Sequence, residues 1–325
     1  MKAAVSVVYV THRQEPQFDW FADGLARQLE DDDEVEVVLV DGLPSPRRGA
    51  RFEAIVAGRF AFTYAEAKPT AFNGPHQRTS RPLFAAASAR NTGVVHASRP
   101  YLAFVDDCSV PVPGWWDEVR EAARHQYVVA GAYQKRLNMQ VSDGLLESST
   151  VEPLGSDSRW ALGDDRRVVE ITGGQLYGAS LGVARQVMLD VNGFDELCNG
   201  IGGEDCNLGI RLEMAGHRVF YSRRMTTIES EDHAAGYSTP LGRIDPLLDE
   251  RDYRERLARF GVSKRIIEGR CDASHMALDL VYGLGKPQSI GNHFELRDVQ
   301  PADLPATSRG LPTTFWFDGR PLADL

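Results

Sequence analysis

Two short acidic segments carry the residue types best suited to phosphate chemistry. The first is Asp106-Asp107-Cys108-Ser109, which directly follows the apolar run Tyr101 to Val105. Paired carboxylates at a strand end hold a divalent cation, and the cation in turn neutralises a diphosphate. The second is Gly202-Gly203-Glu204-Asp205, ahead of a helical pattern. Both segments also have ordinary structural explanations, because Asp and Ser favour turns and N-caps and acidic residues favour a helix N-terminus.

The surroundings of the first acidic segment follow a known order. They read Ala89-Arg90-Asn91-Thr92-Gly93, then Tyr101 to Ser109, then Pro113-Gly114-Trp115-Trp116. This order closely resembles family 2 glycosyltransferases, in which an Ala-Arg-Asn-x-Gly helix precedes the strand with an Asp-x-Asp motif and Pro-x-Trp follows. The resemblance implies an α/β protein of the GT-A fold, Rossmann-like, with a mostly parallel central sheet flanked by helices. It also implies a nucleotide-sugar donor and Mn²⁺ or Mg²⁺ at Asp106 and Asp107.

The chain departs from this motif at Cys108, which stands where the family has the second Asp. Mg²⁺ and Mn²⁺ prefer oxygen ligands, so the thiol is a poor direct ligand and Asp107 or a water would have to substitute. The geometry of the metal site, and less strongly the dependence on metal, are therefore open.

The second acidic segment resembles the Gly-Gly-Glu-Asp helix start of family 2 enzymes and of β-1,4-galactosyltransferases. The upstream Val191-Asn192-Gly193-Phe194-Asp195-Glu196 is a further family hallmark. By this resemblance Asp205 is the catalytic base of an inverting transfer, which needs a carboxylate to take the acceptor proton, and Glu204 contacts the acceptor hydroxyl. His233 is implied as a third metal ligand, with a solvated histidine in an acidic loop as the alternative.

The same resemblance indicates the donor contacts. Thr11, Arg13 and Asp41 match nucleotide-facing positions after the first two strands, and Asp41 is well placed to accept from the uracil ring N–H. Arg90 is placed to approach the diphosphate, or else to form a salt bridge on the helix surface.

On the acceptor side, Gly173-Gly174-Gln175 lies where the family places backbone close to the ligand, and glycine permits that approach. A plain turn is the alternative. Trp115 and Trp116 are candidates for stacking on sugar faces, although one of them is expected to face the core.

The elements that must position these residues alternate between strand and helix. Apolar runs predict buried strands at Ala3–Val10, Val35–Val40 and Tyr101–Val105. Further strands are expected at 128–133, 176–183 and 217–221, and helices at 18–29, 84–97, 115–125, 184–191 and 204–215. Ligands bind beyond the carboxyl ends of such strands, where Thr11-His12-Arg13, Asp41 and Asp106-Asp107 fall. Neither GxGxxG after the first strand nor a P-loop is present, which disfavours dinucleotide and P-loop enzymes.

These patterns predict a catalytic domain over residues 1–235, with a nucleotide-sugar half at 1–110 and an acceptor half at 111–235. Residues 43–81 read as an irregular, functional loop or subdomain. Residues 236–325 read as a helical C-terminal extension packed on the core and closing the acceptor side, with helices at 246–260 and 263–282. Its Pro-rich tail from Pro301 is the part least expected to belong to the core.

The bulk properties limit the classes of partner and compartment. The formal net charge of −10 disfavours general attraction to nucleic acid or anionic lipid. No apolar run is long enough to span a membrane, and Met1 to Val10 reads as a strand rather than a signal peptide. The four cysteines show no zinc spacing, which favours free thiols in a reduced, cytoplasmic setting.

The resemblance therefore implies an inverting, hexosyltransferase-like enzyme that uses a nucleotide-sugar, expected to be UDP-linked. The acceptor is open among a saccharide, a protein side chain and a modified nucleobase. Two alternatives stay open. One is a nucleotidyltransferase that makes the sugar nucleotide, although Thr11 to Pro16 lacks the glycine-rich loop of that class. The other is a catalytically inactive binding module, which only Cys108 favours.

Overall fold

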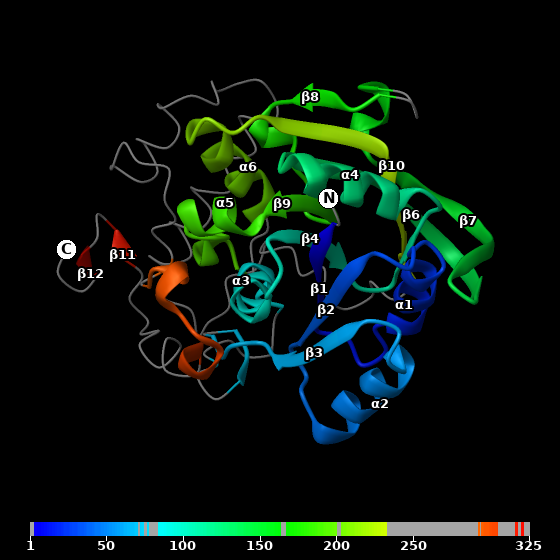
Figure 1. Ribbon diagram of the computed structural model, residues 1–325, viewed down its shortest axis with the longest axis horizontal. Helices are drawn as coiled ribbons and strands as arrows, with labels where there is room; N and C mark the ends of the chain where they lie inside the picture. Colours follow the sequence, from blue (N-terminus) through cyan, green and yellow to red (C-terminus); the bar gives the residue numbers. More distant parts are fainter. Residues whose placement is uncertain are drawn as a thin grey trace.

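The computed structural model describes residues 3–70, 72–74, 77, 84–163, 167–199, 203–232, 292, 294–304, 316–317 and 320–321. A ten-stranded sheet runs through the protein, with helices on both of its faces (Figure 1). The predicted α/β class is therefore confirmed.

The sheet is mostly parallel. Its order is β3-β2-β1-β4-β9-β6-β10-β5, with β7 paired to β6 and β8 to β10. Strands β1 to β4 pair in parallel, β6 pairs in parallel with β10, and β9 joins the two groups by running antiparallel to β4 and β6. The carboxyl ends of β1, β2, β3, β4, β6 and β10 consequently lie along one edge. The strands are β1 (Ala4–Thr11), β2 (Glu34–Asp41), β3 (Ala61–Glu66), β4 (Tyr101–Asp106), β5 (Ser109–Pro111), β6 (Val128–Ser142), β7 (Leu145–Ser156), β8 (Val169–Ile171), β9 (Ser180–Ala184) and β10 (Val219–Ser230).

The helices divide between the two faces and bury two hydrophobic cores. On one face lie α1 (Phe18–Ala26), α2 (Pro46–Val56) and α4 (Trp115–His125), and on the other α3 (Ala86–His96), α5 (Arg185–Asp190) and α6 (Glu204–Met214). Side chains of β1 alternate between the cores, as strand geometry requires: Val7 and Tyr9 enter the first, Val8 and Val10 the second. Short 3₁₀ turns are η2 (Ser158–Ala161), η3 (Gly173–Gln175), η4 (Glu196–Cys198), η5 (Leu296–Asp298) and η6 (Pro301–Asp303).

Residues 43–81 are more regular than predicted. They contain helix α2 and strand β3, so the expectation of an irregular segment is wrong. Helix α2 has an ordinary start, because the Ser45 side chain accepts from the Arg48 backbone N–H and Pro46 occupies the first turn. Strand β3 is a half-buried edge strand without a continuous apolar run. The strands β5, β7 and β8 were not predicted either.

The described C-terminal residues pack beside α3. Leu296, Val299 and Leu304 are buried in the core that α3, α5 and α6 share. Leu304 belongs to the segment from Pro301 that was least expected to be core, and for this residue the expectation is wrong. The helices expected at 246–260 and 263–282 lie outside the described residues. Strands β11 (Trp316–Phe317) and β12 (Arg320–Pro321) form a separate antiparallel pair. No described helix has both the length and the apolar character needed to cross a membrane.

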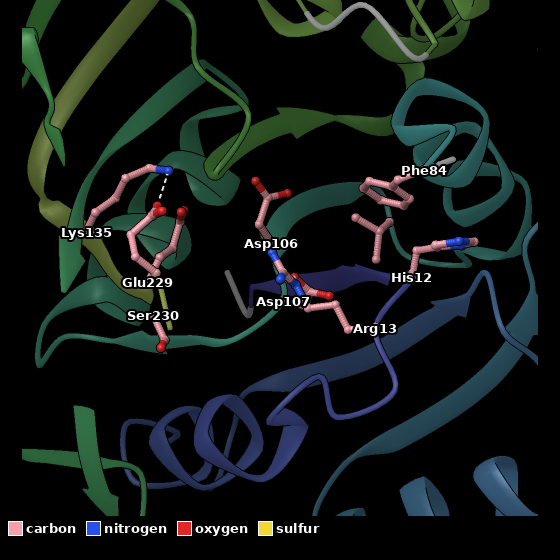
Figure 2. A pocket seen from close by; sticks show the side chains of 10 residues that line it. His12, Arg13, Phe84, Asp106, Asp107, Lys135, Glu229 and Ser230 are labelled. Carbon is pink, nitrogen blue, oxygen red and sulfur yellow. Dashed lines mark hydrogen bonds and ion pairs between the residues drawn. The ribbon is translucent and has the colours of Figure 1, made fainter. Parts of the chain in front are cut away.

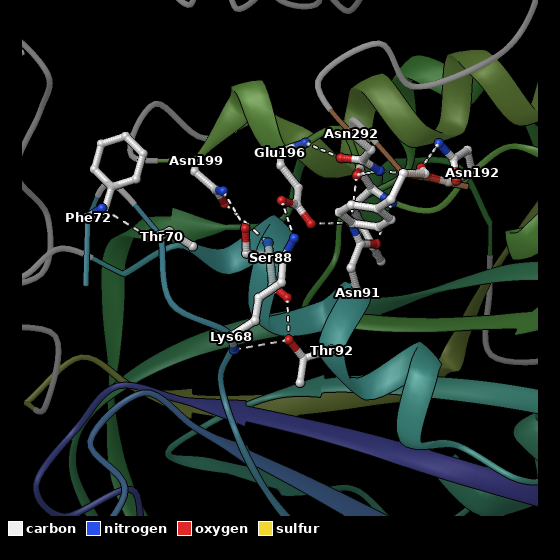
Figure 3. A network of polar contacts seen from close by, with 12 residues as sticks. Lys68, Thr70, Phe72, Ser88, Asn91, Thr92, Asn192, Glu196, Asn199 and Asn292 are labelled. Atoms are coloured by element: carbon white, nitrogen blue, oxygen red, sulfur yellow. Dashed lines mark hydrogen bonds and ion pairs between the residues drawn. The ribbon is translucent and has the colours of Figure 1, made fainter. Parts of the chain in front are cut away.

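A buried polar network connects this C-terminal segment to the side of the sheet that α3 covers (Figure 3). The Lys68 ammonium lies 2.6 Å from Glu196 Oε2, and Asn91 Nδ2 donates to Glu196 Oε1 at 2.9 Å. Asn292 Nδ2 donates to the backbone oxygens of Asn192 at 2.7 Å and Phe194 at 3.0 Å, while its Oδ1 accepts from the Glu196 backbone N–H. We call Lys68, Asn91, Glu196 and Asn292 the Glu196 network.

Candidate active site

A pocket of about 240 Å³ opens at the carboxyl edge of the sheet. Figure 2 shows Asp106 between Glu229 and Lys135 on one side and His12 and Phe84 on the other. The side chains come from the ends of β1, β4 and β10 and from the middle of β6, which the parallel register brings together. The lining residues are Val10, His12, Arg13, Phe84, Asp106, Asp107, Lys135, Glu229, Ser230 and Glu231.

A second pocket, of about 270 Å³, adjoins the first. The two share Asp106, Lys135 and Glu229 as lining residues. The second pocket adds Tyr133, Tyr177, Gly178, Ala179 and Asp205. The two acidic segments that the sequence singled out therefore meet at one continuous site, although about a hundred residues separate them in the chain.

Arg90 joins the two acidic segments. Its Nη2 lies 2.7 Å from Asp106 Oδ1 and its Nη1 lies 2.5 Å from Glu204 Oε1, while its side chain is only 5% exposed. Burial opposes the positive charge, but Asp106, Glu204 and Asp205 outweigh it and raise the pKa of Arg90. Arg90 is thus neither a helix-surface salt bridge nor a free diphosphate ligand. It holds the end of β4 against the start of α6.

Asp205 lines the second pocket. Its Oδ2 accepts from the Gly178 backbone N–H at 2.9 Å and its Oδ1 from the Cys206 N–H at 2.7 Å. Helix α6 begins after Gly203, whose φ of 79° is left-handed and so suits glycine. Glu204, by contrast, is buried against Arg90.

Asp106 and Asp107 differ in availability. The Asp106 side chain is 33% exposed and lines both pockets. Asp107 accepts from Thr11 Oγ1 at 2.6 Å and from Arg13 Nε at 2.8 Å. Burial raises the pKa of Asp107, although Arg13 and Thr11 oppose the shift. Asp107 therefore anchors Arg13 at the pocket, and Asp106 is the more open carboxylate.

Cys108 points away from the pocket. Its backbone is left-handed, with φ of 55°, and its side chain is buried with Sγ 3.7 Å from the Glu15 carbonyl oxygen. The Cys108 N–H donates to the Pro16 carbonyl at 2.8 Å, which fixes this orientation. Burial raises the pKa of the thiol, so it stays protonated.

Glu229 and Lys135 were missed by the sequence analysis. Burial raises the pKa of Glu229 to about 8, and the neighbouring carboxylates add to the shift while Lys135 opposes it. Within the described part of the chain, Glu229 Oε1 is buried without a hydrogen-bond partner. Lys135 is paired with Glu231 instead. The alternation Glu229-Ser230-Glu231 at a strand end was the available signal, because it places both acids on one face.

The expected uracil contact at Asp41 is not supported by its position. Asp41 is fully buried and lines neither pocket. Both of its oxygens accept hydrogen bonds, from Arg48, the Leu43 N–H and the Tyr64 hydroxyl. Thr11 is also buried, with its hydroxyl committed to Asp107. The side chains that reach the pocket from this side are those of His12, Arg13 and Phe84.

The acceptor-side expectations also change. Gly173 packs directly on α6, since a Cβ there would stand 2.2 Å from the Gly209 carbonyl oxygen. The glycine that does face the pocket is Gly178, where a Cβ would lie 3.1 Å from Arg90 Nη2 and 3.4 Å from Asp205 Cβ. Gly174 is buried and Gln175 caps its own turn through Thr172.

Neither tryptophan is open to a sugar. Trp115 and Trp116 are both fully buried in the core beneath α4. The Trp115 indole N–H donates to Ser180 Oγ at 2.9 Å and that of Trp116 to Asp33 Oδ2 at 2.6 Å. Sugar stacking by either ring is therefore not supported.

His233 lies outside the described residues. Within them, no three His, Cys, Asp or Glu side chains are grouped so as to hold a metal ion by themselves. Two oxygen donors, Asp106 and Glu229, do border the same space, and the free Glu229 oxygen suits a hard cation. The donor set thus fits Mg²⁺ or Mn²⁺ that is completed by phosphate oxygens and water.

The fold resembles solved structures, although neither a family model nor a curated protein matches the sequence. A mannosyltransferase from Pyrobaculum calidifontis in complex with GDP-Man and Mn²⁺ aligns with a TM-score of 0.51 at 15% identity, covering 96% of this chain and 74% of that one. GalNAc-T7 with UDP, GalNAc and Mn²⁺ aligns with a TM-score of 0.54 at 12% identity, covering 85% and 54%.

Residues 1–349 of S. aureus TarS in complex with UDP align with a TM-score of 0.53 at 14% identity, covering 94% of this chain and 78% of that one. The chain therefore spans about half of GalNAc-T7 and about three quarters of the other two. Identities this low show a common fold and no more. The sheet order, the two helical faces and these alignments together establish that the chain has the GT-A fold.

Proposed function

We propose that the protein is an inverting glycosyltransferase of the family 2 type, which moves a sugar from a UDP-sugar to an acceptor hydroxyl. The observation that carries this proposal is the junction at Arg90. One guanidinium binds Asp106, at the end of the central strand β4, and Glu204, next to Asp205 at the start of α6. The acidic donor pocket and the half-exposed Asp205 carboxylate in the adjoining pocket are thereby held in a fixed relation.

The first pocket is the proposed donor site. His12, Arg13 and Phe84 would receive the nucleotide, and Asp106 would face the diphosphate. The solved relatives in fold support this choice of donor, since they were obtained with GDP-Man, UDP and GalNAc, or UDP. A divalent cation bound at Asp106 would neutralise the diphosphate as it leaves.

The second pocket is the proposed acceptor site. The acceptor hydroxyl would attack the anomeric carbon in line, and the bond from that carbon to the diphosphate would break. Asp205 would take the hydroxyl proton, because its carboxylate is half-exposed at this pocket and is oriented by the Gly178 N–H. Glu204 would act through Arg90 rather than by touching the acceptor, because it is buried.

A panel of UDP-, GDP- and dTDP-sugars tests the proposal. Ligand binding stabilises the native state by mass action, so the correct donor should raise the melting temperature. Release of free UDP should then depend on an acceptor, drawn from saccharides, peptides and oligonucleotides that carry modified bases. Pyrophosphate release from UTP and a sugar phosphate would instead indicate a nucleotidyltransferase. Binding without any release would indicate an inactive module.

Replacement of the proposed base separates catalysis from binding. Asp205→Asn should lower turnover by about 10²–10⁴-fold and leave donor affinity nearly unchanged. Asp31→Asn is the matched control, because it makes the same change at an exposed turn away from the site. Turnover above one tenth of the wild-type value in Asp205→Asn would exclude this residue as the base.

A further inference from the structure

We propose that Glu229 supplies the carboxylate that the strand-end motif lacks at Cys108, so that Asp106 and Glu229 together bind the divalent cation. This assignment rests on the proposed function, because it concerns the cation that would accompany a nucleotide-sugar. It differs from the ligand set that the sequence motif implies, which was Asp106, Asp107 and His233.

The position that normally carries the second acid cannot serve here. The Cys108 side chain is buried under the chain at Glu15, and its thiol is a poor ligand for a hard cation. Asp107 is the other acid in the segment, but both of its oxygens are hydrogen-bonded to Thr11 and Arg13. Of the three residues after Val105, Asp106 is the one whose carboxylate lines both pockets.

The sheet brings Glu229 next to this gap. Strand β10 pairs with β5 so that Glu229 lies opposite Ser109, and the Ser230 N–H donates to the Cys108 carbonyl oxygen at 3.0 Å. Glu229 is therefore attached by backbone hydrogen bonds to the turn in which the motif acid is missing. It lines both pockets together with Asp106, as Figure 2 shows for the first of them.

Among the described residues, the Glu229 carboxylate is only partly compensated, by Lys135. Its Oε1 is buried without a hydrogen-bond partner among the described residues. Lys135, the nearest cation in strand register, is paired with Glu231. A buried carboxylate without a partner is unfavourable in a folded protein, and a cation in the pocket would remove that cost. Mg²⁺ and Mn²⁺ commonly use one or two carboxylates together with phosphate oxygens and water, so two protein ligands suffice.

Direct measurement of Mn²⁺ binding tests this assignment without relying on turnover. The full chain would be titrated with Mn²⁺ in the presence of UDP, and free Mn²⁺ followed by electron paramagnetic resonance. Glu229→Gln should weaken Mn²⁺ binding by about tenfold or more, and Glu229→Asp should weaken it less. Glu66→Gln is the matched control, because Glu66 is exposed at the carboxyl end of the edge strand β3, and it should stay within about twofold of the wild type. Thermal unfolding of each variant checks that the fold is intact.

The outcomes separate this inference from the proposed function. Wild-type Mn²⁺ affinity in folded Glu229→Gln would overturn the assignment. Turnover in EDTA by a wild-type protein that binds no Mn²⁺ would overturn it too, while leaving the transferase function intact and pointing to Lys135 and Arg13 as the diphosphate cations. Mn²⁺ binding that depends on Glu229, in a protein that turns over no nucleotide-sugar, would support the cation site and reject the function.

Discussion

The Glu196 network and the acidic pocket place the same side chain in opposite surroundings. Glu196 is 4% exposed, and its two oxygens accept from Lys68 and Asn91. Glu229 lies in β10 between β5 and β6, and one of its oxygens has no hydrogen-bond partner in the described part of the protein. The nearest lysine to Glu229 in register, Lys135, is paired with Glu231.

The difference separates structural carboxylates from functional ones. A buried charge is tolerated where donors and a countercharge surround it, and it is costly where they do not. The Glu196 network therefore contributes to folding and joins the C-terminal segment to α3. The pocket instead retains an unfavourable group at the place where a ligand is proposed to bind. Such concessions to function at the expense of stability are usual at active sites.

Removing the network's cation should produce the largest loss of stability. Lys68→Met removes the lysine that forms an ion pair with the buried Glu196 carboxylate, so the free energy of unfolding should fall by about 3–5 kcal/mol. Urea denaturation followed by circular dichroism measures this change. Lys135→Met is the matched control, since the Lys135–Glu231 pair is partly exposed and should contribute no more than about 1 kcal/mol. Equal losses of unfolding free energy in the two variants would mean that the buried pair stabilises the fold no more than a partly exposed pair does.

Removing the hydrogen bonds of Asn292, which join the C-terminal segment to the core, should lower the free energy of unfolding by a smaller amount. Asn292→Ala leaves the backbone oxygen of Asn192 without its side-chain donor and removes one of the two side-chain donors to the Phe194 oxygen, at a cost of about 1–3 kcal/mol. The exposed neighbour Glu295 provides the control, and Glu295→Ala should change stability by no more than about 0.5 kcal/mol. A neutral Asn292→Ala would show that the segment at 294–304 is held by its apolar side chains alone.

The sequence predicted the framework of the site better than its chemistry. Continuous apolar strands are local signals, and they placed Asp106 at the carboxyl edge of the sheet. Asp205 was assigned only by the resemblance of its Gly-Gly-Glu-Asp segment. The pairing of β10 with β5 joins residues far apart in the chain, so no local pattern brought Glu229 to Ser109. Which polar groups are already occupied is equally a property of the assembled fold.

Asp41 illustrates this second limit. Its position after β2 correctly placed it at the carboxyl edge, yet the arrival of α2 and β3 surrounds it with Arg48 and Tyr64. Both elements were missed, because the segment is rich in Arg, Gly and Pro and its strand lacks a continuous apolar run. The strand pattern therefore located Asp41 correctly, but whether its carboxylate is available to a ligand depends on neighbours from other elements, which that pattern does not predict.

The smallest expected change is a gain in stability rather than a loss, and it directly tests the comparison between Glu229 and Glu196. Glu229→Gln should raise the free energy of unfolding in EDTA at pH 8.5 by about 1 kcal/mol, because it replaces a buried, unpaired charge with a neutral amide. The pKa of Glu229 in the folded protein, about 8, lies above the ordinary 4.5. The stability that this group contributes is therefore present at low pH and is lost as the pH rises toward 8. The gain in the variant should accordingly shrink at pH 6.

The same replacement in the network supplies the contrast. Glu196→Gln removes the partner of a buried lysine, so it should lower the free energy of unfolding. Urea titrations of the wild type and of both variants, at pH 6 and pH 8.5 in EDTA, give the change in the free energy of unfolding for each variant at each pH. If both variants lost stability to the same extent and without pH dependence, Glu229 would be as well accommodated as Glu196. The acidic pocket would then contain no carboxylate that destabilises the protein without a cation, and the proposed difference between the pocket and the Glu196 network would be wrong.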